Sequence, residues 1–341
     1  MFKLQEISSI VQRLVVEHVP IRLQHRIACG IQAFSLQTFQ SINANGRTLA
    51  DNRKTGESRS YRVLHDKRSG DLVRRILMSM LPKQPLLYCS LDHSQFGPFC
   101  IAVLAVSVRK GRALPFWVQV NASGAALMEP LLAALSSLAS WIRPDQQVVL
   151  VMDRWFCGPK LFDLIAGMNW YFITRAKYDR RVWVPWEERN SIPVGEISQE
   201  EAIVVYHDQP LRMVRSHWHA GMKQPQPWFL LTNLLPQLAS RIQILHRYEE
   251  RFEIEETFKD MKWLGRLEWH QVRSVEVIRT LLLFIFFGWW LLWAIYRRDK
   301  DLQRRQRRTH DKHLLSWFRT TWESLYRLVW PDELRFTPLC P

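Results

Sequence analysis

The segment from Tyr248 to Lys262 holds the residues of this chain whose types and spacing are best suited to chemistry. Read as a helix of about 100° per residue, it places Arg251, Glu255 and Lys262 within about 60° of Tyr248. One helix face would therefore carry a phenol, a guanidinium, a carboxylate and an ammonium group. A carboxylate flanked by cations suits a site that binds a metal ion and a phosphodiester together.

The same segment predicts a second, apolar face. Ile254, Phe258 and Met261 gather on a stripe roughly 80° away, as expected for the side of a helix that packs against a core. The alternative to a working site is an exposed helix with salt bridges, which is the commoner meaning of mixed charge.

The spacing of these four residues resembles the signature of a known family. Tyr248, two residues, Arg251, three residues, Glu255, six residues and Lys262 are similar to the Y-R-E-K group of DDE transposases, from the bacterial cut-and-paste elements called insertion sequence family four. The resemblance implies two aspartates upstream, each at a strand end.

Two aspartates fit that expectation. The apolar run at residues 86–91 ends at Asp92, and the run at residues 148–152 ends at Asp153. Continuous apolar runs of this length are typical of buried strands. Each aspartate alone is better explained as a turn residue or a helix cap. Their joint placement with Glu255 favours a catalytic triad.

The elements around these acids predict a ribonuclease H-like α/β fold. Residues 101–108 and 116–120 read as strands, residues 125–142 as a helix, and residues 170–174 as a strand after a further helical stretch. Three strands, helix, strand, helix, strand and a later helix with the third acid is the order of that fold.

The resemblance also implies the chemistry. Phosphoryl transfer needs an activated nucleophile and a stabilised leaving oxygen, which two divalent ions about 4 Å apart can supply. Asp92 would bridge the ions, and Asp153 and Glu255 would each complete one coordination sphere. Mg²⁺ is the expected ion, with Mn²⁺ as a substitute.

A β-rich insertion is expected at about residues 175–235, where short strands at 182–184, 202–206 and 211–214 alternate with turn residues. Near its end, Trp228 precedes Tyr248 by twenty residues and resembles the family tryptophan that stacks on a base flipped out of the transposon end. Such stacking is worth on the order of 1–3 kcal/mol. A core tryptophan in a strand is the alternative reading.

Charge indicates a polyanionic partner. The chain of 341 residues has a net charge of +15, and basic residues concentrate at 43–83, just before the first acid. Apolar residues at positions 7, 10, 11, 14 and 15 predict a helical start. We therefore expect a helical, DNA-end-binding region at 1–83, a catalytic core at 84–296 and a basic tail at 297–341.

The apolar segment at residues 280–296 allows two interpretations, a transmembrane helix or a buried helix. Its length is at the lower limit for a transmembrane helix, and a basic run follows it. The resemblance implies instead a helix that packs behind the catalytic sheet, so we expect no membrane partner.

Other motifs are less informative. Five cysteines without a CxxC pair indicate neither a zinc site nor a disulfide framework. His217-Trp218-His219 is better explained as strand surface than as a metal site. The chain shows no Walker-type loop and no signal peptide, which fits a bacterial cytoplasmic, nucleoid-associated protein.

Together these features predict a DNA transposase. It would bind the terminal inverted repeats of its element, cleave them through a hairpin intermediate and join them to target DNA, with double-stranded DNA as partner and a homodimer in the DNA complex. The alternatives are a ribonuclease H-like nuclease and a DNA-binding regulator derived from a transposase.

Overall fold

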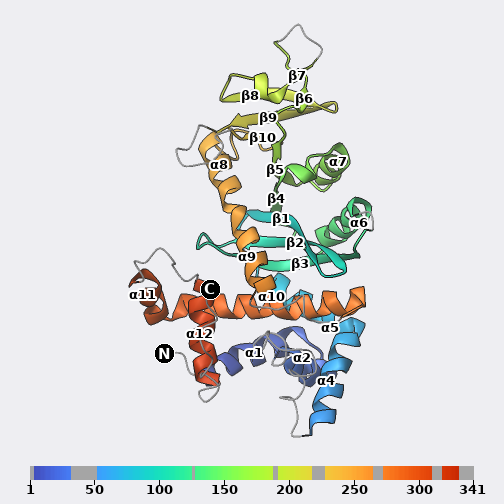
Figure 1. Ribbon diagram of the computed structural model, residues 1–341, viewed down its shortest axis with the longest axis vertical. Helices are drawn as coiled ribbons and strands as arrows, with labels where there is room; N and C mark the ends of the chain where they lie inside the picture. Colours follow the sequence, from blue (N-terminus) through green and yellow to red (C-terminus); the bar gives the residue numbers. More distant parts are fainter. Residues whose placement is uncertain are drawn as a thin grey trace.

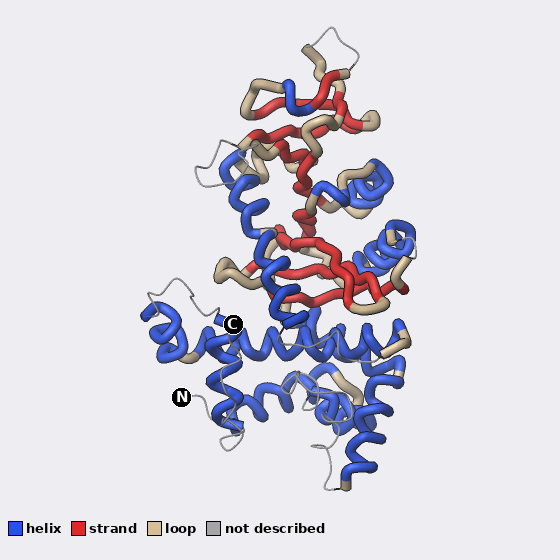
Figure 2. The backbone as a smooth tube through the Cα atoms, in the orientation of Figure 1, coloured by secondary structure: helices blue, strands red, loops and turns tan. Residues whose placement is uncertain are grey.

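The computed structural model describes residues 4–31, 52–124, 127–186, 191–216, 227–263, 272–308 and 317–329. The His217-Trp218-His219 motif and Cys340 lie outside these residues. A large sheet occupies one half of the molecule and a helical layer the other, with one long helix between them (Figure 1). Figure 2 shows the same division between strands and helices.

A five-stranded unit forms the centre of the sheet, in the order β3-β2-β1-β4-β5. The strands β1, β4 and β5 are parallel, and β2 and β3 are antiparallel to their neighbours. Helices α6 and α7 lie side by side against one side of the sheet (Figure 1). The bounds are β1 Leu86–Phe96, β2 Phe99–Ser107, β3 Ala113–Ala122, α6 Met128–Ala139, β4 Gln147–Met152, α7 Pro159–Gly167 and β5 Tyr171–Ala176. This order confirms the predicted ribonuclease H-like α/β fold.

The first strand is longer than its apolar run. Residues 86–91 pair with β4, but β1 continues past Asp92 to Phe96 because it forms a hairpin with β2, closed at Phe96 and Phe99. Asp92 therefore lies within a strand at the point where its parallel partner ends.

The predicted insertion extends this sheet. Strands β10, β9 and β8 continue it beyond β5 in antiparallel order, while β6 and β7 form a separate pair. The bounds are β6 Arg181–Val182, β7 Ile192–Pro193, a 3₁₀ turn Val194–Glu196, β8 Glu201–Tyr206, β9 Gln209–Arg215 and β10 Phe229–Thr232.

The helix predicted across residues 248–262 is divided in two at Arg251. Helix α8 spans Arg241–Glu250 and begins with a capping box of Ser240 and Gln243, and α9 spans Phe252–Trp263. The Arg251 N–H donates to Tyr248 O at 3.2 Å, and the Arg251 carbonyl accepts from the Ile254 N–H at 3.1 Å. These tighter i to i+3 bonds interrupt the α-helix without turning the chain away, so α8 and α9 follow nearly one line (Figure 1).

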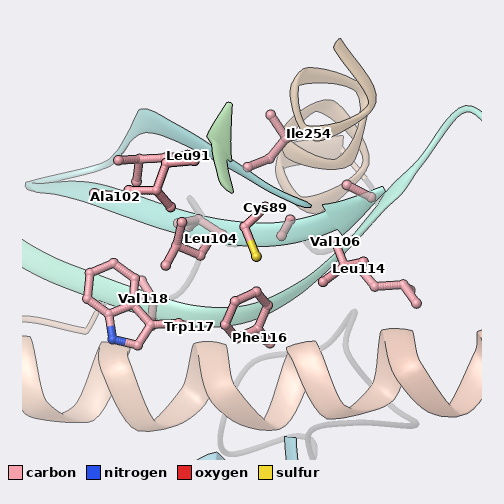
Figure 3. Close-up of a cluster of buried hydrophobic side chains, with 14 of the residues drawn as sticks. Cys89, Leu91, Ala102, Leu104, Val106, Leu114, Phe116, Trp117, Val118 and Ile254 are labelled. Atoms are coloured by element: carbon pink, nitrogen blue, oxygen red, sulfur yellow. The ribbon is translucent and has the colours of Figure 1, made fainter. Parts of the chain in front are cut away.

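The apolar segment forms most of α10, Val275–Arg298, which lies along the edge strand β3. In Figure 3, Phe116 and Trp117 of β3 lie above this helix, while Ile254 of α9 approaches the other side of the same cluster. The Trp290 indole N–H donates to Pro115 O at 2.8 Å. This one helix is long and apolar enough to cross a membrane, and most of its apolar stretch is buried inside the protein.

The opposite side of α10 carries the N-terminal helices and α12 (Figure 1). Helix α5 begins with Asp66, whose carboxylate accepts from the Arg68 N–H. The bounds are α1 Leu4–His18, α2 Ile21–Gly30, α4 Arg53–His65, α5 Lys67–Ser79, α11 Lys300–Arg308 and α12 Trp317–Val329. The apolar face of α10 is thus shared between the sheet and this helical layer.

Gly30 tests the contact between the helical layer and α10. A Cβ at this position would lie well inside the van der Waals contact distance of the Phe284 ring and 2.8 Å from Val63 Cγ1. We expect Gly30→Ala to lower the free energy of unfolding by roughly 1–3 kcal/mol, because overpacking forces the neighbours to move. Urea unfolding measures the change.

Gly167→Ala is the matched control, since a Cβ at Gly167 meets nothing within 4 Å. Its stability should stay the same or rise slightly, as alanine favours the helix. Equal stability of both variants would contradict the close approach of α2 to α10.

Candidate active site

Asp92 and Asp153 are brought together by strand register. The last residue pair between the parallel strands β1 and β4 is Leu91 with Met152, so Asp92 and Asp153 are the residues that directly follow this pair. Adjacent strands are about 4.8 Å apart, which makes the two carboxylates close neighbours. The predicted placement of each aspartate at the end of an apolar run therefore brings the two acids together through strand pairing.

Arg251 joins the first and third acids. Its Nη1 donates to Asp92 Oδ2 at 3.0 Å, and its Nη2 donates to Glu255 Oε1 at 2.6 Å. Arg251 and Asp92 are both buried, whereas the side chain of Glu255 is 42% exposed. A charge-assisted bond between buried partners is strong and geometrically specific. The guanidinium thus fixes α9 relative to β1.

Asp92 has the most perturbed carboxyl of the site. Burial raises the pKa of Asp92 to about 6, while Arg251 and the His93 N–H, which donates to Asp92 Oδ1 at 2.8 Å, lower it. Asp153 and Glu255 raise the pKa further because they are like charges nearby. The electrostatics place all three acids in one cluster.

Asp153 is held by the turn that follows β4. Its Oδ1 accepts from the Trp155 N–H at 2.7 Å, and its backbone carbonyl accepts from Thr174 Oγ1 at 3.0 Å. The carboxylate therefore caps the short 3₁₀ turn Arg154–Phe156. The Trp155 ring lies 4.5 Å from the His93 ring and is 44% exposed at the surface.

Glu255 is positioned by polar contacts on another side of α9. Glu253 accepts from Ser107 Oγ at 2.7 Å and from the Gly111 N–H at 2.7 Å, which ties the helix to the β2–β3 turn. Thr257 Oγ1 exchanges hydrogen bonds of 3.0 Å with the backbone of Ala113. One turn further along, Arg112 Nε pairs with Asp260 at 2.6 Å. These contacts fix the rotation of α9, and with it the direction of Glu255.

An aromatic cluster lies on the other side of Arg251. The guanidinium carbon of Arg251 is 4.6 Å from the Phe252 ring centroid and 5.6 Å from that of Tyr248. Trp228 packs edge-on against Tyr248 at 5.1 Å, and both rings are buried. Burial raises the pKa of the Tyr248 phenol, so it stays protonated. Tyr248 therefore neighbours Arg251, and Trp228 packs against Tyr248 within the protein.

Lys262 lies farther along the same line. Its Nζ is 5.3 Å from the ring centroid of Phe96, at the end of β1. Seven residues of helix separate it from Glu255, a rise of about 10 Å. The four residues of the motif thus follow β1, with the acid next to Asp92 and the lysine toward the β1–β2 turn.

The donor set fits divalent cations by its chemistry. Carboxylate oxygens are the ligands that Mg²⁺ prefers, and the buried Asp92 carboxylate is disfavoured by two like charges. Within the described ranges, however, no three His, Cys, Asp or Glu side chains are close enough to hold one ion as they stand. The Arg251 guanidinium supplies the positive charge between Asp92 and Glu255, where a metal ion could otherwise do so.

Sequence reasoning missed several residues of the site. His93 directly follows Asp92, and Trp155 lies two residues after Asp153, so closeness in sequence was the available signal. Glu253 carried no signal beyond the helical pattern, which placed it away from the working face. Its hydrogen bonds to the β2–β3 turn depend on a tertiary contact 142 residues away in sequence.

Comparison with known proteins gives the family. The model of the transposase DDE domain matches residues 102–291, more than half of the chain, a span that includes Asp153 and Glu255 and begins after Asp92. A comparison with curated proteins gave no match.

Among solved structures, the chain is similar to a cryo-EM structure of the piggyBac transposase synaptic complex with hairpin DNA. The sequence identity is 11%, the TM-score is 0.45, and the alignment covers 93% of this chain and 74% of that chain. The family match extends over the β2–β5 strands, α8, α9 and most of α10. The chain therefore belongs to the family of the transposase DDE domain.

Proposed function

We propose that this protein is a cut-and-paste transposase of the Y-R-E-K group. It binds the terminal inverted repeats of its element, cleaves them by phosphoryl transfer through a hairpin intermediate and joins the ends to target DNA. The observation that carries the proposal is the alignment of Asp92 and Asp153 on adjacent strands, with Glu255 tied to Asp92 through Arg251.

Asp92, Asp153 and Glu255 are proposed as the ligands of Mg²⁺, with Mn²⁺ as a substitute. Two such ions, when bound, activate the attacking oxygen and stabilise the leaving oxygen. The protein contributes an oxygen-only donor set and a partly buried setting, in which charges interact more strongly than in water.

Arg251 is suited to hold the scissile phosphate. Its Nε is buried and has no hydrogen-bond partner among the described residues, so one donor remains to be used. A guanidinium that exchanges these two carboxylates for phosphate oxygens keeps an acceptor for each Nη throughout. Tyr248 would support the guanidinium from behind, and Lys262 would contact the neighbouring backbone phosphate.

We also propose a role for each region of the chain. We propose that the region 1–83 binds the transposon ends, that the core at 84–296 performs catalysis, and that two copies act together in the DNA complex. The net charge of +15 supports a DNA partner.

The first test is cleavage of the element's own ends. Asp92→Asn, Asp153→Asn and Glu255→Gln are each expected to lower strand cleavage in Mg²⁺ by at least about 100-fold while end binding persists, because each removes a metal ligand at constant volume. Denaturing gels of nicked and hairpin products, together with binding assays, measure the two effects.

Glu256→Gln is the matched control for that test. Glu256 follows Glu255 directly, but it pairs with Lys259 and Arg112 rather than with the acids. It should retain cleavage within a few fold of the parent protein. A Glu256 variant as inactive as the Glu255 variant would refute the assignment of the third acid.

The raised pKa of Asp92 predicts a pH-dependent stability in chelator. The folded protein holds the proton of Asp92 up to a pH of about 6, above the ordinary value of 3.8, so the burial of this carboxyl is tolerated at low pH and becomes unfavourable as pH rises between these values. Relative to the parent, Asp92→Asn should therefore gain up to about 3 kcal/mol in the free energy of unfolding from pH 4 to pH 7. Urea unfolding at several pH values measures this difference.

Asp163→Asn is the control for the pH series, because Asp163 is exposed. Its stability difference from the parent should change little with pH. A flat difference for Asp92→Asn as well would show that the Asp92 carboxylate is not buried among like charges.

Trp228 is proposed to stack on an extruded base, and its packing adds a structural role. Trp228→Ala is expected to lose about 3 kcal/mol of stability because a buried indole is removed. Base stacking predicts in addition that hairpin formation falls further than first-strand nicking and is partly restored by an abasic nucleotide at the flipped position.

Trp170→Ala provides the comparison, since Trp170 is also buried but packs in a different hydrophobic cluster from the one that contains Trp228 and Tyr248. It should lower both steps in proportion to its loss of stability. A parallel fall of both steps in Trp228→Ala, without abasic rescue, would exclude the stacking role.

A further inference from the structure

A cavity lined by two arginines lies apart from the three acids, where three helices and a strand meet. Helices α5, α6 and α10 and strand β3 enclose a cavity of 180 Å³. The end of α10 that carries Arg279 lies against α5, with α6 beside the sheet above it (Figure 1). The lining residues that matter are Arg74, Gln119, Ser137, Trp141 and Arg279.

Arg74 lacks a hydrogen-bond acceptor for its Nε and a close carboxylate among the described residues. Its Nε is buried and has no hydrogen-bond partner in the described part of the chain. Its nearest carboxylate, Asp71, is 3.8 Å from Nη1 and is itself 62% exposed. An exposed pair at that distance contributes little. A buried donor of this kind needs an acceptor to offset its desolvation.

Arg279 adds a second positive charge to the same cavity from α10. Burial lowers the pKa of Arg74, Asp71 raises it, and Arg279 lowers it further, so the two guanidinium groups repel each other. Glu276, the acid one turn before Arg279, accepts a hydrogen bond from Ser274 Oγ at 2.9 Å and does not line the cavity. Two cations from separate elements therefore converge on a cavity whose lining, among the residues that the structure describes, contains no carboxylate.

Trp141 forms one wall and restricts the movement of Arg74. The guanidinium carbon of Arg74 is 5.6 Å from the Trp141 ring centroid, and that of Arg75 is 5.9 Å from it. A guanidinium that lies over an indole keeps its N–H donors directed sideways. Arg74 can then donate into the cavity without losing its contact with the ring.

We propose that this cavity binds a backbone phosphate of DNA. Two arginines from separate elements provide several N–H donors for one tetrahedral oxyanion. The volume suits a single phosphate group with some water, since water occupies about 30 Å³ and whole small-molecule ligands need about 300 Å³ or more. That the cavity binds a phosphate is inferred from the cavity alone. That this phosphate belongs to DNA rests on the proposed function of the protein in DNA binding.

The phosphate itself is tested by thermal unfolding of the full-length protein. Inorganic phosphate, titrated against sodium chloride at matched ionic strength and pH, should raise the melting temperature of the parent in a saturable way. Arg279→Gln and Arg74→Lys should each weaken the apparent phosphate affinity by about 10-fold, a loss of about 1.4 kcal/mol.

Arg75→Gln is the matched control. Arg75 adjoins Arg74 on α5 and is exposed, and it does not line the cavity. This variant removes the same charge and should keep the phosphate effect. Equal phosphate stabilisation of all the variants, or no effect of phosphate on the parent, would overturn the site.

Whether the bound phosphate belongs to DNA is tested by the salt dependence of binding to a DNA duplex of unrelated sequence. Loss of one phosphate contact should reduce the slope of log K against log salt by about 0.9 in Arg279→Gln relative to Arg75→Gln. If the parent protein binds inorganic phosphate at this cavity but Arg279→Gln and Arg75→Gln have equal slopes, the phosphate that the cavity binds does not belong to DNA. This test does not depend on cleavage, so its failure leaves the catalytic proposal unaffected.

Discussion

Repulsion between three clustered carboxylates, of which Asp92 is buried, is the constraint on which the rest of this structure depends. Strand register alone forces Asp92 and Asp153 together, and Glu255 approaches from α9. Like charges in a partly buried setting are unfavourable unless a cation balances them. Arg251 provides that balance, because it bonds to two of the three acids. One side chain at the junction of α8 and α9 thus links β1, through Asp92, to α9, through Glu255.

The position of Arg251 matters only if α9 cannot rotate. Glu253, Thr257 and Asp260 hold the helix to the β2–β3 turn and to the start of β3 through directional polar contacts. The apolar residues of α9 would tolerate small rotations, since dispersion is not directional. Hydrogen bonds to backbone groups do not tolerate them. The site thus combines apolar packing, which supplies affinity between the elements, with polar contacts, which supply orientation.

Sequence was sufficient for the features that depend on local pattern. The apolar runs before Asp92 and Asp153 predicted the strands, and the order of elements predicted the fold. Features set by tertiary partners were not accessible. The helical pattern could not show that Arg251 interrupts the helix, or that Tyr248 and Trp228 are buried against each other. The extension of the main sheet by β10, β9 and β8 was likewise hidden, because strand pairing over long separations leaves no local signal.

The sharing of α10 between the sheet and the helical layer has an evolutionary consequence. A recognition module joined by a loose linker can be exchanged between relatives without disturbing the enzyme to which it is attached. Here the N-terminal helices cover an apolar surface that would otherwise face water. Their exchange would have to preserve the buried contacts at Gly30 and Phe284. Given the end-binding role proposed for these helices, new specificity for DNA would be easier to acquire by substitution on their outer faces than by wholesale recombination.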